Sequence, residues 1–309
     1  MVQSLSKILP PHLLRPILGR LNYERLYEIR LRANRPVSLN YGSKFYFLTE
    51  RGLASMSDNA FTADAGLINE VVVRATEYSL YAVNDQLRQG FITVTGGVRI
   101  GIAGETVREA GETKTVKNYG SVNIRIPHEI KGCADKAYQH CCAPEIHNTL
   151  IVSPPGAGKT TILRDLARLL GNRLPAVNVL LADERNELAA AHRGIPQLEV
   201  GMHTDVIANA LKPYAFTAGI RSLAPDVLIT DELATLQDAE AVEYAAASGV
   251  RVIASCHAQN HLDLSRKPGF DALIAKRVFS RYINLSQRLG AGTLDGIFDA
   301  DFNEIGTRQ

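Results

Sequence analysis

The sequence predicts an α/β protein, in which a domain with a mostly parallel sheet follows a smaller α+β domain. Up to about residue 140, segments such as 36–48 and 90–105 are rich in aromatic and β-branched residues, which is typical of strands joined by tight turns. Beyond that point, short runs of Val, Ile and Leu alternate with segments of helical periodicity, which predicts parallel strands buried on both faces. We therefore expect two domains, residues 1–140 and 141–309.

Two helices are expected in the N-terminal domain. Residues 65–90 carry apolar side chains at helical spacing, and this segment ends at Gly90. A short amphipathic helix is expected after Pro11, where leucines alternate with arginines.

The C-terminal domain is expected to repeat the order strand, turn, helix. The predicted strands are 149–153, 176–182, 226–230 and 250–255. The predicted helices are 159–170, 210–223 and 236–248, and Pro213 allows helix only after it. The tail, residues 276–299, is expected to form a closing hairpin around Gly290–Gly292.

The composition is that of an ordinary globular protein, with 46% hydrophobic and 21% charged residues among 309. The formal net charge is only +2, so the chain as a whole does not call for nucleic acid or acidic lipid as a partner. No apolar stretch approaches the roughly 18–20 residues that cross a bilayer. The N-terminus lacks the small-residue cleavage site of a signal peptide, so we expect a cytoplasmic protein.

The four cysteines are expected to be reduced thiols, because they form no C-x-x-C pair. The run "HCC" at 140–142 could suggest zinc, but adjacent cysteines rarely bind one ion, so we interpret Cys141 and Cys142 as thiols.

The segment "SPPGAGKTT" is the strongest functional signal. Glycines at 156 and 158 allow backbone N–H groups to converge on a phosphate, and the helix beginning at Lys159 adds the positive end of its dipole. Lys159 would reach the β- and γ-phosphates, and the Thr160 hydroxyl would bind Mg²⁺. Ser153 stands where this motif usually has its first glycine. The residues expected to bind the nucleotide are Ser153, Pro154, Pro155, Gly156, Ala157, Gly158, Lys159, Thr160 and Thr161.

Two acidic pairs follow predicted strands. Asp231 and Glu232 come directly after strand 226–230, at the edge where open α/β sheets bind ligands. One carboxylate can join the Mg²⁺ shell and the other can polarise the attacking water, and the residues alone leave open which does which. Asp183 and Glu184 follow strand 176–182 and are expected to emerge beside the P-loop; an N-capping pair on a surface loop is the alternative.

His257 follows another predicted strand, within "VIASCHAQNH", and is expected at the same edge. A metal site is disfavoured because His261 is the only other ligand nearby. Contact with the γ-phosphate is the favoured role, and a buried core histidine is the alternative.

In this order, the four motifs resemble those of the RecA-like secretion ATPases of the type II/type IV superfamily. The counterparts of the acidic box, the second acidic strand end and the histidine box are "ADERNE", "LITDEL" and "ASCHAQN". The phrases "YEIRLRANRPV", "GGVRIGIAGE" and "VNIRIPHEIKG" narrow the resemblance to the family of stage III sporulation AA proteins, over nearly the whole chain. Two features depart from the superfamily: the acidic pair is Asp-Glu rather than Gly-Glu, and the tetracysteine zinc element of some members is absent.

The resemblance implies a RecA-like ATPase domain in a hexameric ring, with ATP and Mg²⁺ between neighbouring subunits. It implies that Glu232 activates water, that Glu184 assists, and that His257 contacts the γ-phosphate. It also implies that N-terminal arginines complete the site of an adjacent domain, although each could instead be a solvated or structural arginine. The candidates are Arg30, Arg32, Arg99 and Arg125, of which we assign Arg99 and Arg125 to catalysis.

The resemblance further implies a membrane-embedded partner of the secretion-platform type, stage III sporulation protein AB. The protein would then lie in the mother-cell cytoplasm, peripheral to the inner membrane through that partner, and would drive a secretion-like assembly during endospore formation.

Two other functions stay open. A nucleic-acid-stimulated ATPase with the same core is disfavoured, because the balanced charge lacks a basic footprint and no nucleic-acid-binding module is expected after "FNEIGTRQ". A nucleotide-binding scaffold that barely hydrolyses ATP is disfavoured by the intact pair Asp231–Glu232.

Overall fold

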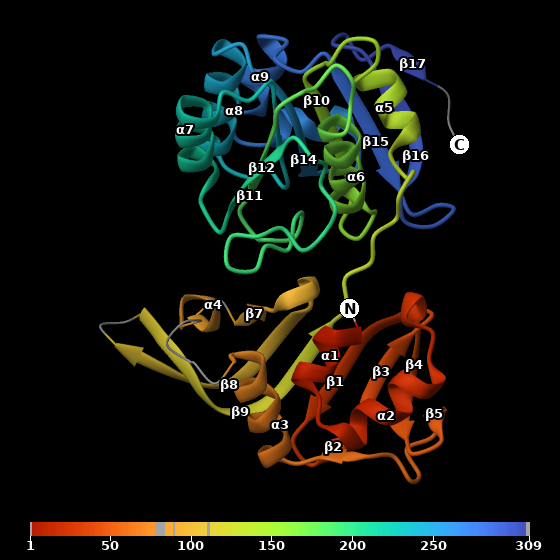
Figure 1. The fold of residues 1–309 in the computed structure, drawn as a ribbon. Helices are drawn as coiled ribbons and strands as arrows, with labels where there is room; N and C mark the ends of the chain where they lie inside the picture. Colours follow the sequence, from red (N-terminus) through yellow and green to blue (C-terminus); the bar gives the residue numbers. More distant parts are fainter. Residues whose placement is uncertain (1, 78–83, 89, 110–111, 307–309) are drawn as a thin grey trace. The chain divides into compact units, whose positions relative to one another are not determined.

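The computed structural model describes residues 2–77, 84–88, 90–109 and 112–306 (Figure 1). The chain divides into two compact units, Met1–His128 and Glu129–Gln309. The division falls earlier than the boundary expected at residue 140. The reason is that α5 (Asp135–Cys141) packs in the second unit, where Ala137 and Cys141 share a core with α6 (Lys159–Gly171).

The described part of the N-terminal unit is built on a seven-stranded sheet of order β5-β4-β3-β1-β9-β8-β7, in which all neighbours are antiparallel. The expected strands within 36–48 and 90–105 are confirmed, whereas β1, β5 and β9 were not predicted. A separate pair joins β2 (Arg35–Pro36) to β6 (Thr62–Ala63). The strands of the sheet are β1 (Leu26–Arg32), β3 (Ser38–Tyr41), β4 (Lys44–Thr49), β5 (Gly52–Ala54), β7 (Phe91–Thr93), β8 (Arg99–Glu109) and β9 (Glu112–Arg125).

Helices pack against one face of this sheet, because apolar and polar residues alternate along its strands. Side chains of α1 (Val2–Ile8), α2 (Pro11–Arg20) and α3 (Ala65–Ala75) share one core with Ile29 and Leu31 of β1. The helix expected after Pro11 is confirmed as α2.

The helix expected over 65–90 is not continuous in the described residues. Helix α3 is capped by Asp64, whose carboxylate accepts the N–H of Leu67 at 2.7 Å, and it ends at Ala75. Helix α4 follows (Asn84–Arg88). Residues 78–83 and 89 of the predicted helix lie outside the described residues.

The C-terminal unit contains an eight-stranded sheet of order β12-β11-β13-β14-β10-β15-β16-β17 within the residues described (Figure 1). The strands from β12 to β15 are parallel to one another, and β16 and β17 are antiparallel additions. The α/β class with a mostly parallel sheet is therefore confirmed. The strands are β10 (Thr149–Ser153), β11 (Val179–Asp183), β12 (Thr204–Ala208), β13 (Val227–Thr230), β14 (Arg251–His257), β15 (Arg281–Ser286), β16 (Thr293–Phe298) and β17 (Glu304–Gly306).

Both faces of the parallel part are covered by helices, which explains its continuous apolar strands. Ile151 of β10 packs in the core on the side of α5 and α6. Its neighbours Leu150 and Val152 pack on the other side, with Phe216 of α7 (Lys212–Leu223) and Val242 of α8 (Leu236–Ala247). Helix α9 (Phe270–Ala275) lies on that second side as well.

The closing hairpin expected over 276–299 is confirmed as β15 and β16, which pair from Tyr282 with Phe298 to Ser286 with Thr293. Strands β12 and β17 were not predicted. β12 begins with two polar residues, Thr204 and Asp205, and none of its residues is fully buried, so its pattern lacks the apolar run of a central strand.

Candidate functional site

The P-loop joins β10 to α6, as predicted. Gly156 and Gly158 have φ angles of +75° and +89°, in the left-handed region that glycine adopts without strain. Ser153 is the last residue of β10 and has no positive φ, so a serine fits where the motif usually has glycine. The hairpin loop supports the turn, because Gln287 Nε2 donates to Pro155 O at 3.0 Å.

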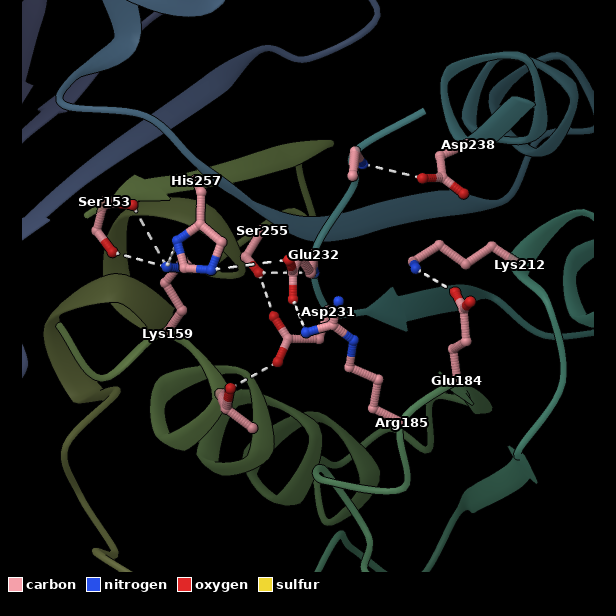
Figure 2. Close-up of polar contacts among 12 residues, drawn as sticks. Ser153, Lys159, Glu184, Arg185, Lys212, Asp231, Glu232, Asp238, Ser255 and His257 are labelled. Atoms are coloured by element: carbon pink, nitrogen blue, oxygen red, sulfur yellow. Dashed lines mark hydrogen bonds and ion pairs between the residues drawn. The ribbon is translucent and has the colours of Figure 1, made fainter. Parts of the chain in front are cut away.

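Lys159 begins α6 and its side chain is buried. Its ammonium lies 3.0 Å from Ser153 Oγ, 3.3 Å from Pro154 O and 2.9 Å from His257 Nδ1 (Figure 2). Burial lowers the pKa of Lys159 below its ordinary value, and the charges of Asp231 and Glu232 oppose that shift.

His257 reaches the P-loop because β14 is the direct neighbour of β10, with Ser153 and His257 in register. An ammonium has donors only, so His257 Nδ1 accepts from Lys159. The neutral imidazole then carries its proton on Nε2, which lies 3.9 Å from Glu232 Oε1. His257 is half-exposed rather than a core residue, and it stands between the lysine and the second carboxylate (Figure 2).

Asp231 and Glu232, which follow β13, have different surroundings. Asp231 Oδ2 accepts the Thr160 hydroxyl at 2.5 Å, and its other oxygen accepts the hydroxyl of Ser255. The carboxylate is therefore attached to the first turn of α6, where it and Thr160 present oxygen ligands of the kind that Mg²⁺ prefers.

The carboxylate of Glu232 has other partners than that of Asp231. Its backbone has φ +48°, and its N–H donates to Ser255 Oγ at 3.1 Å. Its Oε2 forms an ion pair with Arg185 Nη1, and its Oε1 faces His257 (Figure 2). The two neighbouring acids therefore have different partners.

Asp183, the last residue of β11, and Glu184 do not lie beside the P-loop, so that expectation is wrong. Strands β13 and β14 separate β11 from β10 in the sheet, so Asp183 and Glu184 share the edge but not the neighbourhood of Lys159. Glu184 Oε2 instead accepts from Lys212 Nζ of α7 at 2.5 Å, and Lys212 is buried (Figure 2).

Asp183 is a buried anchor for the loop that follows it. Its carboxylate accepts the N–H groups of Glu187, Leu188 and Ala189 at 2.8, 3.0 and 2.8 Å. Burial raises the pKa of Asp183 above its ordinary value, while these three donors favour the ionised form.

The four candidate arginines of the N-terminal unit project from one face of its sheet. Arg30 and Arg32 are two residues apart on β1, and Arg125 of β9 is paired directly with Glu28 of β1 on one side and with Arg99 of β8 on the other. Residues directly opposite each other project to the same face, so these side chains form one row.

Within this row the arginines differ in their surroundings. Arg30 forms an ion pair with Glu28 at 2.9 Å, and Arg125 lies 4.0 Å from the same carboxylate. The Arg99 guanidinium stacks on the ring of Phe91, 3.6 Å from its centroid. Arg125 is the more exposed of the two assigned residues.

A cavity of about 440 Å³ opens beside the first turn of α6. Its walls come from residues 130–137, from the P-loop helix and from the hairpin loop, and include Cys133, Lys136, Gly158, Thr161, Ile162 and Gly292. Burial raises the pKa of Cys133 to about 12, so its thiol stays protonated at neutral pH.

Sequence reasoning missed three residues of the site. Arg185 and Lys212 provide the cations for Glu232 and Glu184, and Ser255 joins Asp231 to the Glu232 backbone. Arg185 stands directly after Asp183 and Glu184, and Ser255 lies two residues before His257. Their positions within these motifs were the only signal that the sequence offered.

Residues 2–77, 84–88, 90–109 and 112–306 contain no group of three or more His, Cys, Asp or Glu arranged to hold a metal ion. Among these same residues, no helix combines the length and apolar character that crossing a bilayer requires.

In the sheet, the P-loop strand β10 lies beside β14, which ends in His257. Next come β13, which leads to Asp231 and Glu232, and β11, which ends in Asp183. This arrangement is that of a RecA-like ATPase fold. Solved structures of ATPases share this fold, among them DotB and PilT. The ATPase DotB of Yersinia pseudotuberculosis is 16% identical with a TM-score of 0.57, covering 90% of this chain and 76% of that chain. The pilus retraction motor PilT with bound ADP is 16% identical with a TM-score of 0.56, covering 84% and 74%.

The family follows from the sequence comparisons. The family model for sporulation stage III, protein AA, matches residues 2–305. The stage III sporulation protein AA of Bacillus subtilis (strain 168) is 38% identical over 282 residues, which are 90% of this chain and 88% of that protein. The chain therefore belongs to the sporulation stage III protein AA family, as the resemblance of its motifs predicted.

Proposed function

We propose that this protein hydrolyses ATP at the P-loop and uses it to drive a membrane-embedded, secretion-like assembly during endospore formation. The observation that carries the proposal is the division of the pair after β13. Asp231 is bound to Thr160, while Glu232 faces His257, which in turn contacts Lys159. An ATPase needs one acid for the metal and one for water, and this pair provides both.

Thr160 and Asp231 fit a magnesium ion, because a hydroxyl and a carboxylate lie together at the start of α6. When bound with ATP, Mg²⁺ would neutralise charge on the β- and γ-phosphates. Lys159 would give its ammonium to the same phosphates in place of Ser153 and Pro154, and backbone N–H groups of the P-loop would bind them.

Glu232 is proposed to orient and polarise the attacking water. His257 would contact the γ-phosphate through the proton on Nε2, and so report its presence to Glu232. The cavity beside Thr161 supports binding of the base and ribose, since it adjoins the residues that would hold the phosphates.

The assisting role of Glu184 stays a prediction. Its ion pair with Lys212 supports an indirect contribution, through the position of the loop that follows β11.

The functional test is phosphate release from Mg²⁺-ATP by the full chain, with Lys159→Ala as the variant and Lys276→Ala as the control. Lys276 lies in an exposed ion pair with Glu243, which contributes little to stability. We expect turnover in the unmodified chain and the control, and its loss with weaker ATP binding in Lys159→Ala. A chain that binds ATP and hydrolyses none, alone or with its membrane partner, would be a scaffold instead.

A hexameric ring with arginines acting in trans is the second part of the proposal. The row of arginines on one sheet face supports it, because such a row can meet the phosphates of another subunit. Subunits carrying Arg99→Ala and Arg125→Ala should be inactive, as should subunits carrying Glu232→Gln. A mixture of the two should recover part of the activity. Native mass measurement with a non-hydrolysable ATP analogue checks the ring, and a monomer under all conditions would contradict it.

The membrane partner is proposed to be of the secretion-platform type, stage III sporulation protein AB, which would hold the ring at the inner membrane of the mother cell. Co-purification of the two chains from detergent extract, with and without ATP, checks this assignment. Nucleic acid is not an expected partner, and polynucleotide that stimulated turnover would overturn this expectation.

A further inference from the structure

Arg185 is paired with the proposed water-activating residue. Its Nη1 forms an ion pair with Glu232 Oε2, although the two residues follow different strands. We propose that Arg185 is a positioning residue that holds Glu232 for attack of water on the γ-phosphate. This inference rests on the proposed ATPase function and adds a residue that the motifs did not assign.

The backbone that carries Arg185 is firmly attached to the P-loop helix. Asp183 binds three N–H groups of the loop just beyond Arg185. Arg164 of α6 donates to the carbonyl oxygens of Glu187 and Leu188, both at 2.6 Å. The base of the Arg185 side chain is therefore fixed relative to α6, the helix that begins at Lys159.

The ion pair occupies one carboxylate oxygen of Glu232 and leaves the other directed inward. Oε1 lies 3.9 Å from His257 Nε2, and His257 Nδ1 lies 2.9 Å from Lys159 Nζ. A water activated by Glu232 would use the oxygen on the lysine side, where the phosphate is expected. The pair with Arg185 thus sets which way the carboxylate faces (Figure 2).

The exposure of the pair argues that this contact matters for function rather than for folding. The Arg185 side chain is 63% exposed and that of Glu232 is 24% exposed. Ion pairs in such surroundings contribute little to stability, because water competes for both partners and the side chains lose conformational freedom. If the ion pair served only the stability of the fold, replacing Arg185 would therefore have almost no effect on hydrolysis.

The experiment compares Arg185→Gln and Arg185→Lys with the control Arg221→Gln, an exposed arginine on α7. Steady-state hydrolysis of Mg²⁺-ATP gives kcat and KM, and a fluorescent ATP analogue gives Kd. We expect Arg185→Gln to lower kcat about 10- to 100-fold, the loss that misplacement of a reacting group produces. KM and Kd should change less than about twofold, and Arg185→Lys should recover part of kcat.

A double-mutant cycle then separates action through Glu232 from an independent action on the phosphate. Arg185→Gln added to Glu232→Gln should cause no further loss, because the residue to be positioned is already gone. An equal further loss, or a kcat in Arg185→Gln within about twofold of the unmodified chain, would overturn the inference.

The two proposals fail in different ways. If the unmodified chain hydrolyses ATP and Glu232→Gln abolishes it while Arg185→Gln does not, only the inference about Arg185 is wrong. If the unmodified chain hydrolyses no ATP, both are wrong.

Discussion

The ends of β11 and β13 look alike in the sequence and differ in the structure. In both, a short apolar run is followed by Asp and Glu. At β11 the carboxylate of Asp183 accepts three N–H groups of the loop that follows, and Glu184 is paired with Lys212. At β13 the aspartate binds Thr160, and the glutamate faces Arg185 and His257. Strand order, not the local motif, therefore decides which acids lie near the P-loop.

The largest expected effect tests whether the two glutamates differ in catalysis. Glu232→Gln should lower kcat by at least about 100-fold, the contribution of a positioned general base, with ATP binding retained. Glu184→Gln should lower kcat by no more than about threefold, because its carboxylate contacts Lys212 of α7 and β13 and β14 separate its strand from the P-loop strand. Phosphate-release assays on both variants check this. Equal losses would mean that the two strand ends act together in the chemistry.

The next effect tests whether the two aspartates contribute differently to the free energy of unfolding. Asp183→Asn should lower the free energy of unfolding by about 1–3 kcal/mol, because the amide cannot accept all three backbone N–H groups of the buried loop. Asp231→Asn should cost less than about 1 kcal/mol, since an amide oxygen still accepts from Thr160 or Ser255, while Mg²⁺-dependent turnover falls. Urea unfolding of the two variants, followed by circular dichroism, measures both values. If Asp231→Asn were the more destabilising of the two, the comparison would be reversed.

The smallest effect refines the comparison at β13. Ser255 is fully buried, donates to Asp231 and accepts from the Glu232 N–H, so Ser255→Ala removes the connection between the two acids. We expect a loss of about 1 kcal/mol in transition-state stabilisation, roughly fivefold in kcat. Ser222→Ala, at an exposed hydroxyl on α7, is the control. Unchanged turnover in Ser255→Ala would show that the acids are placed by their backbone alone.

Much of the C-terminal unit could be predicted from its sequence. The strand 149–153 has the bounds of β10, and the helix expected from Lys159 is α6, because a Gly-rich turn between an apolar run and a helical pattern is a strong local signal. The N-terminal unit was predicted less completely. β9 carries polar residues along much of its length, and the helix expected over 65–90 is represented by α3 and α4.

The sequence alone determined the family, the Gly-rich turn before α6 and the residue types at each strand end. These properties depend on short-range chemistry: glycine at positive φ, a lysine at a helix start, and acids after buried strands. Only the tertiary structure decided that β14 lies against β10 and that β13 and β14 separate β11 from it. The reason is that strand order is set by how the helices pack on both faces of the sheet. That packing brought Arg185 to Glu232 and left Glu184 with Lys212.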